Sequence, residues 1–134
     1  RFTDRFERIF VGRSMEAPAV VKRKGRYYLM ASGCTGWAPN PARSAVADSV
    51  WGPWKELGNP CRGPGADLTF RGQSTFILPV AGRPDTFICM LDRWSQFDLP
   101  DSRYLWLPLR FSGEGFEVPW RDAWSLDDPG REGP

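Results

Sequence analysis

Two polar residues, Glu16 and Gln73, each stand immediately before a run of apolar and β-branched residues. The chain contains no histidine, which excludes Ser-His-Asp triads, Cys-His dyads and imidazole metal sites built within it. Acid–base chemistry therefore falls to carboxylates, amides, Tyr, Lys or Cys. A carboxylic acid facing an amide suits the recognition of sugar hydroxyls. It also suits glycoside hydrolysis, in which an acid protonates the leaving oxygen and a second group directs water. The alternative for Glu16 is a solvated carboxylate in a turn.

Short strands joined by tight turns must position these two residues. The 13 Pro and 14 Gly interrupt the chain so often that few windows are long enough for a helix. The segments between them are rich in Val, Ile, Phe, Tyr, Trp and Thr, which favour strands. We predict strands over residues 19–21, 27–32, 43–47 and 54–57, and again over 75–80, 86–91, 104–111 and 116–120. Each half of the chain is therefore predicted to form a four-stranded antiparallel unit.

The two halves also form a weak internal repeat. Residues 16–21 align with residues 73–78 at an offset of 57, and Trp37 and Trp94 share that offset. Four-stranded units repeated in this way are typical of β-propeller blades, and a propeller needs about 4–8 blades to close. We therefore predict an all-β fold made of two blades of a larger propeller, and the alternative is a self-contained β-sandwich. Because the first strand of each blade lines the central channel, Glu16 and Gln73 are expected to converge on one pocket.

Composition limits the partners. The chain has 134 residues, 41% of them hydrophobic, which is enough for one domain with a core, and a formal net charge of +2. This near balance predicts no nucleic-acid partner and no membrane anchor, and no apolar run is long enough to span a bilayer.

Cys34, Cys61 and Cys89 leave open one disulfide with a spare thiol, or three inert thiols. Bidentate ion pairs are expected to brace the loops at 92–93 and 101–103.

Several motifs resemble those of family 43 glycoside hydrolases. The stretch Met15-Glu16-Ala17-Pro18-Ala19-Val20-Val21, followed by Gly25-Arg26-Tyr27-Tyr28-Leu29-Met30-Ala31-Ser32, is similar to the third-blade motif of these five-bladed propellers. The segments at 35–41, 72–75, 92–94 and 101–109 resemble the branch that contains exo-β-1,3-galactanases. The resemblance runs from about Glu7 to Leu126. It implies that the chain carries two four-stranded antiparallel blades of a five-bladed propeller.

The resemblance also implies roles for individual residues. Glu16 matches the general acid of the family. Gln73 matches a glutamine that, in the galactanase-like branch, is thought to hold the attacking water in place of the aspartate used by most members. The alternative for Gln73 is a hydrogen bond to a sugar hydroxyl. Glu7 and Thr35 match substrate-binding positions, and Trp37 either stacks on a sugar or packs against its own blade.

The implied activity is exo-acting, inverting hydrolysis of β-1,3-galactan or of the arabinogalactan backbone. Alternatives are an α-L-arabinofuranosidase or β-xylosidase of the same family, or a non-catalytic carbohydrate-binding propeller. The expected partners are a polysaccharide or oligosaccharide and the remaining blades, with no cofactor and no metal ligated by this chain. The expected location is extracellular or periplasmic. We predict a connector at 1–15, blades at 16–60 and 61–126, and a polar tail at 127–134.

Overall fold

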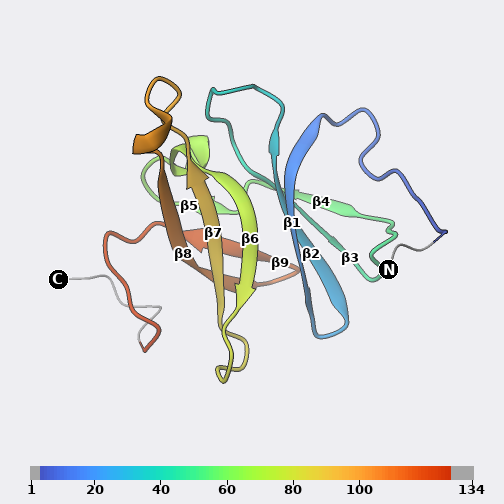
Figure 1. The fold of residues 1–134 in the computed structure, drawn as a ribbon. Helices are drawn as coiled ribbons and strands as arrows, with labels where there is room; N and C mark the ends of the chain where they lie inside the picture. Colours follow the sequence, from blue (N-terminus) through green and yellow to red (C-terminus); the bar gives the residue numbers. More distant parts are fainter. Residues whose placement is uncertain (1–3, 128–134) are drawn as a thin grey trace.

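The structure is a computed structural model in which residues 4–127 are described, and these residues form two β-sheets. Two short 3₁₀ segments, η1 (Ala66–Arg71) and η2 (Leu99–Asp101), are its only helical elements within that range. Figure 1 shows the two sheets meeting where β1 and β6, their first long strands, lie side by side. None of the described helices is long and apolar enough to cross a membrane. Residues 128–134 of the predicted tail fall outside the described range.

The first sheet is a simple antiparallel meander. Its strands, in spatial and chain order, are β1 (Met15–Arg23), β2 (Arg26–Gly33), β3 (Arg43–Ala47) and β4 (Lys55–Gly58). Lys24 and Gly25 connect β1 to β2 with φ angles of 47° and 83°. Two successive left-handed residues match the right-handed twist of the flanking strands, and glycine adopts this conformation without a steric penalty. The predicted hairpin between the first two strands is confirmed.

The second sheet repeats the meander and adds an edge strand. It contains β5 (Cys61–Arg62), β6 (Gln73–Pro79), β7 (Phe87–Arg93), β8 (Arg103–Ser112) and β9 (Gly115–Pro119), in the order β5-β9-β8-β7-β6. Strands β6 to β9 confirm the second four-stranded antiparallel unit. Strand β5 was not predicted: it has two residues and pairs in parallel with β9, Cys61 opposite Val118. Such a short segment carries no hydrophobic periodicity from which a strand could be inferred.

The two sheets share one hydrophobic core. Ile77, Leu91 and Leu107 of the second sheet are at most 1% exposed, and they belong to the same buried cluster as Met30 and Val46 of the first. Burying each such side chain stabilises the fold by about 1.5–3 kcal/mol. The predicted blade boundaries at residues 60 and 126 stay predictions, although the sheets themselves extend from 15 to 58 and from 61 to 119.

Residues equivalent in the internal repeat touch each other across the two sheets. The Ser74 hydroxyl donates to the Ala17 carbonyl at 2.7 Å, across 57 positions of the chain. The rings of Trp37 and Trp94, separated by the same number of positions, lie 5.1 Å apart and nearly perpendicular. These contacts are expected when the first strands of two successive blades lie next to each other. They place the repeat-equivalent polar residues at the same junction.

The second sheet leaves its other face open. Phe76, Met90 and Trp106 are direct neighbours across β6, β7 and β8. Phe76 and Trp106 are both 49% exposed, and Tyr104 on the same face of β8 is 78% exposed. An exposed row of large apolar side chains on a sheet indicates a surface that packs against another element. We call these four residues the outer face of the second sheet.

Candidate active site

Glu16 and Gln73 occupy the starts of the two adjacent first strands. Glu16 is the second residue of β1 and pairs with Ser32 of β2, just before an irregularity in the strand register. Ala17, with φ of 51°, forms part of that irregularity. Gln73 is the first residue of β6 and pairs with Asp92 of β7. A bulge of this kind redirects side chains at a strand end and is frequent beside functional sites.

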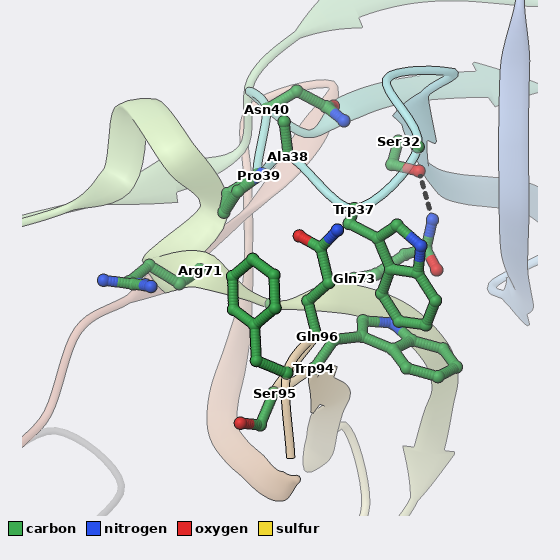
Figure 2. A pocket seen from close by; sticks show the side chains of 13 residues that line it. Ser32, Trp37, Ala38, Pro39, Asn40, Arg71, Gln73, Trp94, Ser95 and Gln96 are labelled. Atoms are coloured by element: carbon green, nitrogen blue, oxygen red, sulfur yellow. Dashed lines mark hydrogen bonds between the residues drawn. The ribbon is translucent and has the colours of Figure 1, made fainter. Parts of the chain in front are cut away.

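The two side chains are hydrogen bonded to each other. Nε2 of Gln73 donates to Oε1 of Glu16 and to Oγ of Ser32, each at 2.9 Å; Figure 2 shows the second bond. Ser32 is 5% exposed, so this network lies at the inner end of the site. The structure thus brings Glu16 and Gln73 together, as the repeat predicted, and their catalytic roles stay a prediction.

This contact is closer than the expected catalytic spacing. The catalytic groups of inverting glycosidases are about 6.5–9.5 Å apart, which leaves room for a water. A direct bond of 2.9 Å leaves no such room between these two atoms. The side chains as they lie here therefore form a closed pair, with no room for another molecule between these two atoms.

A third side chain, that of Cys34, reaches the Glu16 carboxyl. Desolvation, together with the charge and hydrogen bond of Glu16, raises the pKa of the Cys34 thiol. Cys34 is exposed, whereas Cys61 and Cys89 are buried, and all three are unpaired. Burial raises the pKa of Cys61 to about 12 and raises the pKa of Cys89 as well. The two buried thiols are therefore inert, and Cys34 is an accessible thiol beside the predicted acid.

A pocket of about 360 Å³ opens on the side of Gln73. Ser32 and Gln73 form its inner wall, and Trp37, Trp94 and Arg71 line it further out. Figure 2 shows the two indoles next to Gln73, with the Arg71 side chain extending away from them. Trp37 and Trp94 are 48% and 52% exposed. Trp37 packs against the indole that follows a strand of the other sheet, and part of its ring faces the pocket; its predicted contact with a sugar stays a prediction.

Thr35 and Glu7 do not join this cluster. The Thr35 hydroxyl donates to the Ala38 carbonyl at 2.6 Å and accepts from Asn40 at 2.7 Å, so it is engaged within its own loop. Glu7 lies before β1 and pairs with Arg5 at 3.6 Å. Neither residue lines the pocket beside Gln73. Their predicted contacts with substrate stay predictions.

The described part of the chain, residues 4–127, contains no group of three or more Cys, Asp or Glu side chains arranged to hold a metal ion. The loop ion pairs are found in part. Arg103 pairs with Asp101, but Arg93 donates to the Phe70 carbonyl at 3.0 Å instead of pairing with Asp92. The carboxyl next to Arg93 in sequence projects elsewhere because successive residues of a strand face opposite sides.

Comparison with solved structures shows what kind of fold contains this site. A family 43 β-1,3-galactosidase solved with galactodeoxynojirimycin is 50% identical, with a TM-score of 0.79 over 84% of this chain and 32% of that one. An exo-β-1,3-galactanase from Clostridium thermocellum is 39% identical, with a TM-score of 0.74 over 84% of this chain and 25% of that one. A variant of the Phanerochaete chrysosporium exo-β-1,3-galactanase, solved with β-1,3-galactotriose, is 39% identical, with a TM-score of 0.74 over 86% of this chain and 26% of that one.

These similarities define the chain as part of a glycoside hydrolase fold. In sequence and structure it resembles family 43 enzymes of the exo-β-1,3-galactanase-like branch, which confirms the predicted resemblance. The chain spans about a quarter to a third of the length of these solved structures. The two sheets are thus part of a larger fold, as predicted, and not a self-contained sandwich. No family model and no curated protein matches the chain.

Proposed function

We propose that this chain supplies the acid-bearing part of an exo-acting, inverting hydrolase of β-1,3-galactan or of the arabinogalactan backbone. The observation that carries the proposal is the 2.9 Å contact between Glu16 and Gln73, which joins the first strands of both sheets at the wall of a pocket. Similarity to enzymes named as β-1,3-galactosidases and exo-β-1,3-galactanases supports the substrate class.

In this proposal Glu16 is the general acid that protonates the glycosidic oxygen. Gln73 uses both amide protons on Glu16 and Ser32, which fixes the orientation of its amide group. Its Oε1 has no hydrogen-bond partner among residues 4–127, and an amide oxygen can accept a hydrogen bond from water or from a sugar hydroxyl. Binding of a galactosyl unit exchanges the Glu16–Gln73 bond for bonds to the sugar and to the attacking water.

The rest of the enzyme completes the site in this proposal. This chain matches only 32% and 25% of the length of two of the similar structures, so the additional blades supply the opposite wall of the pocket. We also propose that the protein works outside the cytoplasm, extracellularly or in the periplasm, because a polymeric galactan does not cross a cell membrane. Fractionation of the producing cells, with activity found only in the cytosol, would contradict this location.

The assay compares Glu16→Gln with wild type in the full-length enzyme. On β-1,3-galactan the variant should lose about 10²–10⁴-fold in kcat, the usual effect of removing a general acid. On an activated aryl β-galactoside, whose leaving group needs no proton, the loss should be much smaller. Glu56→Gln is the matched control, because Glu56 pairs with Arg13 on the first sheet, outside the pocket. The configuration of the first product, followed by NMR, should be inverted.

Two results would contradict the proposal. Near-normal rates of Glu16→Gln on galactan would show that Glu16 is not the acid. A wild-type product of retained configuration would exclude an inverting reaction, because neither Glu16 nor Gln73 would then be acting in the role assigned to it.

A further inference from the structure

The backbone directly before Gln73 takes an unusual path. Thr69, Phe70 and Arg71 have φ angles of 52°, 56° and 62°, so three successive non-glycine residues lie in the left-handed region. Residues with a Cβ occupy this region as single residues, and rarely in succession. We call residues 69–71 the left-handed turn. Strained backbone persists only where the surrounding structure holds it, and it clusters at functional sites.

Two main-chain bonds close the turn locally. The Phe70 N–H donates to the Gly65 carbonyl at 2.8 Å, and the Gly72 N–H donates to the Thr69 carbonyl at 2.9 Å. Thr69 and Phe70 are only 2% and 3% exposed, so the turn is packed into the protein.

Two side-chain bonds tie the turn to both sheets. The Thr69 hydroxyl donates to the Asn40 carbonyl at 2.7 Å, which reaches the first sheet's loop. The Arg93 Nε donates to the Phe70 carbonyl at 3.0 Å, which reaches the end of β7. Together these bonds determine where the chain enters β6, and Gln73 is the first residue of that strand.

Asn40 is a rigid anchor for this connection. Its Oδ1 accepts from the Gly33 N–H at 2.8 Å, and its Nδ2 donates to the Gly33 carbonyl at 3.2 Å and to the Thr35 hydroxyl at 2.7 Å. The amide of Asn40 is therefore fully engaged at the end of β2. Asn40 is thereby tied to Gly33, the residue that follows Ser32, and Ser32 pairs with Glu16 and accepts a hydrogen bond from Gln73.

We propose that the left-handed turn, tied to Asn40 and Arg93, is a positioning element that sets the distance between Gln73 and Glu16. Ser32, at the end of β2, is the strand partner of Glu16. The left-handed turn places Gln73 of the second sheet next to Ser32. Thr69 and Arg93 do not themselves line the pocket beside Gln73, whereas Asn40 and Arg71 do, so the two bonds act on the reaction through the residues that they position. The inference rests on the proposed function for its catalytic consequence, but the geometric part stands without it.

The test uses Thr69→Val in the full-length enzyme, which removes the hydroxyl with little change of shape. Thr69→Ser keeps the hydroxyl and should restore the wild-type behaviour. Thr75→Val is the matched control, because the Thr75 hydroxyl also donates to a main-chain carbonyl, that of Met90 at 3.0 Å, but within the second sheet. Arg93→Met removes the other hydrogen bond, the one to the Phe70 carbonyl, at a partly exposed residue. It replaces Thr69→Val as the test if that variant fails to fold.

Thr69→Val and Arg93→Met should each lower kcat on β-1,3-galactan by about 10–100-fold, the effect of a misplacement of about 1 Å at a reacting group. KM should stay within about twofold of wild type, since Gln73 acts in the chemical step. Thr69→Ser and Thr75→Val should keep kcat within about threefold of wild type. Unchanged kcat in a folded Thr69→Val and in Arg93→Met would overturn the proposal.

Crystal structures of the same variants separate this inference from the proposed function. In Thr69→Val the Gln73 amide should move away from Glu16, and in Thr69→Ser the 2.9 Å contact should return. If Gln73 keeps its position in both Thr69→Val and Arg93→Met, the positioning role is refuted, whatever the enzyme hydrolyses. A displaced Gln73 in an enzyme whose wild type is inactive on galactan would instead support the positioning role and reject the galactanase proposal.

Discussion

The amide nitrogen of Gln73 is engaged by Glu16 and Ser32, so its Oε1 is the atom that can bind another group. Two roles for Gln73 differ in what this oxygen binds. If Oε1 directs the attacking water, Gln73→Ala should abolish turnover of β-1,3-galactan. Azide should then partly restore the rate by replacing water as the nucleophile, and the glycosyl azide should have the α configuration. If Oε1 only binds a sugar hydroxyl, Gln73→Ala should lower kcat/KM by an amount equivalent to about 1–3 kcal/mol, the cost of one lost hydrogen bond. Azide should then have no effect. Rates with and without azide, together with NMR of the product, distinguish the two.

The alkylation rate of the exposed Cys34 thiol tests its interaction with Glu16, and the measurement needs no substrate. Because desolvation and the Glu16 carboxylate raise the thiol's pKa, less thiolate is present at pH 8 than for an unperturbed cysteine. Iodoacetamide should therefore react slowly with Cys34, and faster as the pH rises toward the raised pKa. Glu16→Gln removes the negative charge, which lowers the pKa of the thiol, and should speed its alkylation at pH 8. Equal rates in the two folded proteins would show that Cys34 and Glu16 do not interact; the urea-unfolded proteins, which should react alike, are the control.

The residues that sequence reasoning missed are those placed by irregular backbone. A regular hairpin continuing from the pairing of Arg23 with Arg26 would place Glu16 opposite Gly33. The irregularity between Glu16 and Ala19 shifts the register by one, so Ser32 faces Glu16 instead. A one-residue shift exchanges which side chains face each other. Ser32 could not be identified without knowing that bulge, whereas the Glu16–Gln73 contact followed from the repeat alone.

Among the elements, the start of β6 depends on a close approach at Gly72. A Cβ built there would lie 3.1 Å from the Leu91 Cβ, and Leu91 is fully buried. The φ angle of Gly72 is −114°, so alanine meets no backbone restriction, and the whole effect is steric. Gly72→Ala should lower the free energy of unfolding by about 1–3 kcal/mol, the usual cost of overpacking. Urea denaturation of the full-length enzyme measures this, and an unchanged midpoint would show that the contact relaxes freely.

The strands were predictable because their residues carry local information. Tyr27 to Ser32 and Tyr104 to Phe111 alternate or cluster apolar residues between Gly and Pro turns, and both became strands close to the predicted limits. The left-handed turn was not predictable, because Thr69, Phe70 and Arg71 all disfavour that backbone when considered singly. Its cause lies in bonds to Asn40 and Arg93, which are distant in sequence.

For the whole molecule, the outer face of the second sheet decides how these 134 residues behave alone. Phe76, Tyr104 and Trp106 present large apolar surfaces on strands whose opposite face is already packed. Expressed alone, the chain should form oligomers or aggregates through this face, which size-exclusion chromatography with light scattering would detect. Replacing Phe76 and Trp106 with threonine should reduce the association. A monodisperse wild-type monomer with a cooperative thermal transition would contradict this prediction.

The contact between Trp37 and Trp94 also has an optical consequence. The two indoles lie just beyond strands of different sheets, Trp37 after β2 and Trp94 after β7, and are 5.1 Å apart at 84°. At that range their electronic transitions couple, and coupled transitions held in a fixed chiral arrangement give paired bands of opposite sign in circular dichroism. The couplet requires both rings in place, so it reports docking of one sheet on the other and not the secondary structure within either. A sugar that enters the pocket beside these rings would alter the same signal, and the protein thus contains an intrinsic spectroscopic probe of both its assembly and its occupancy.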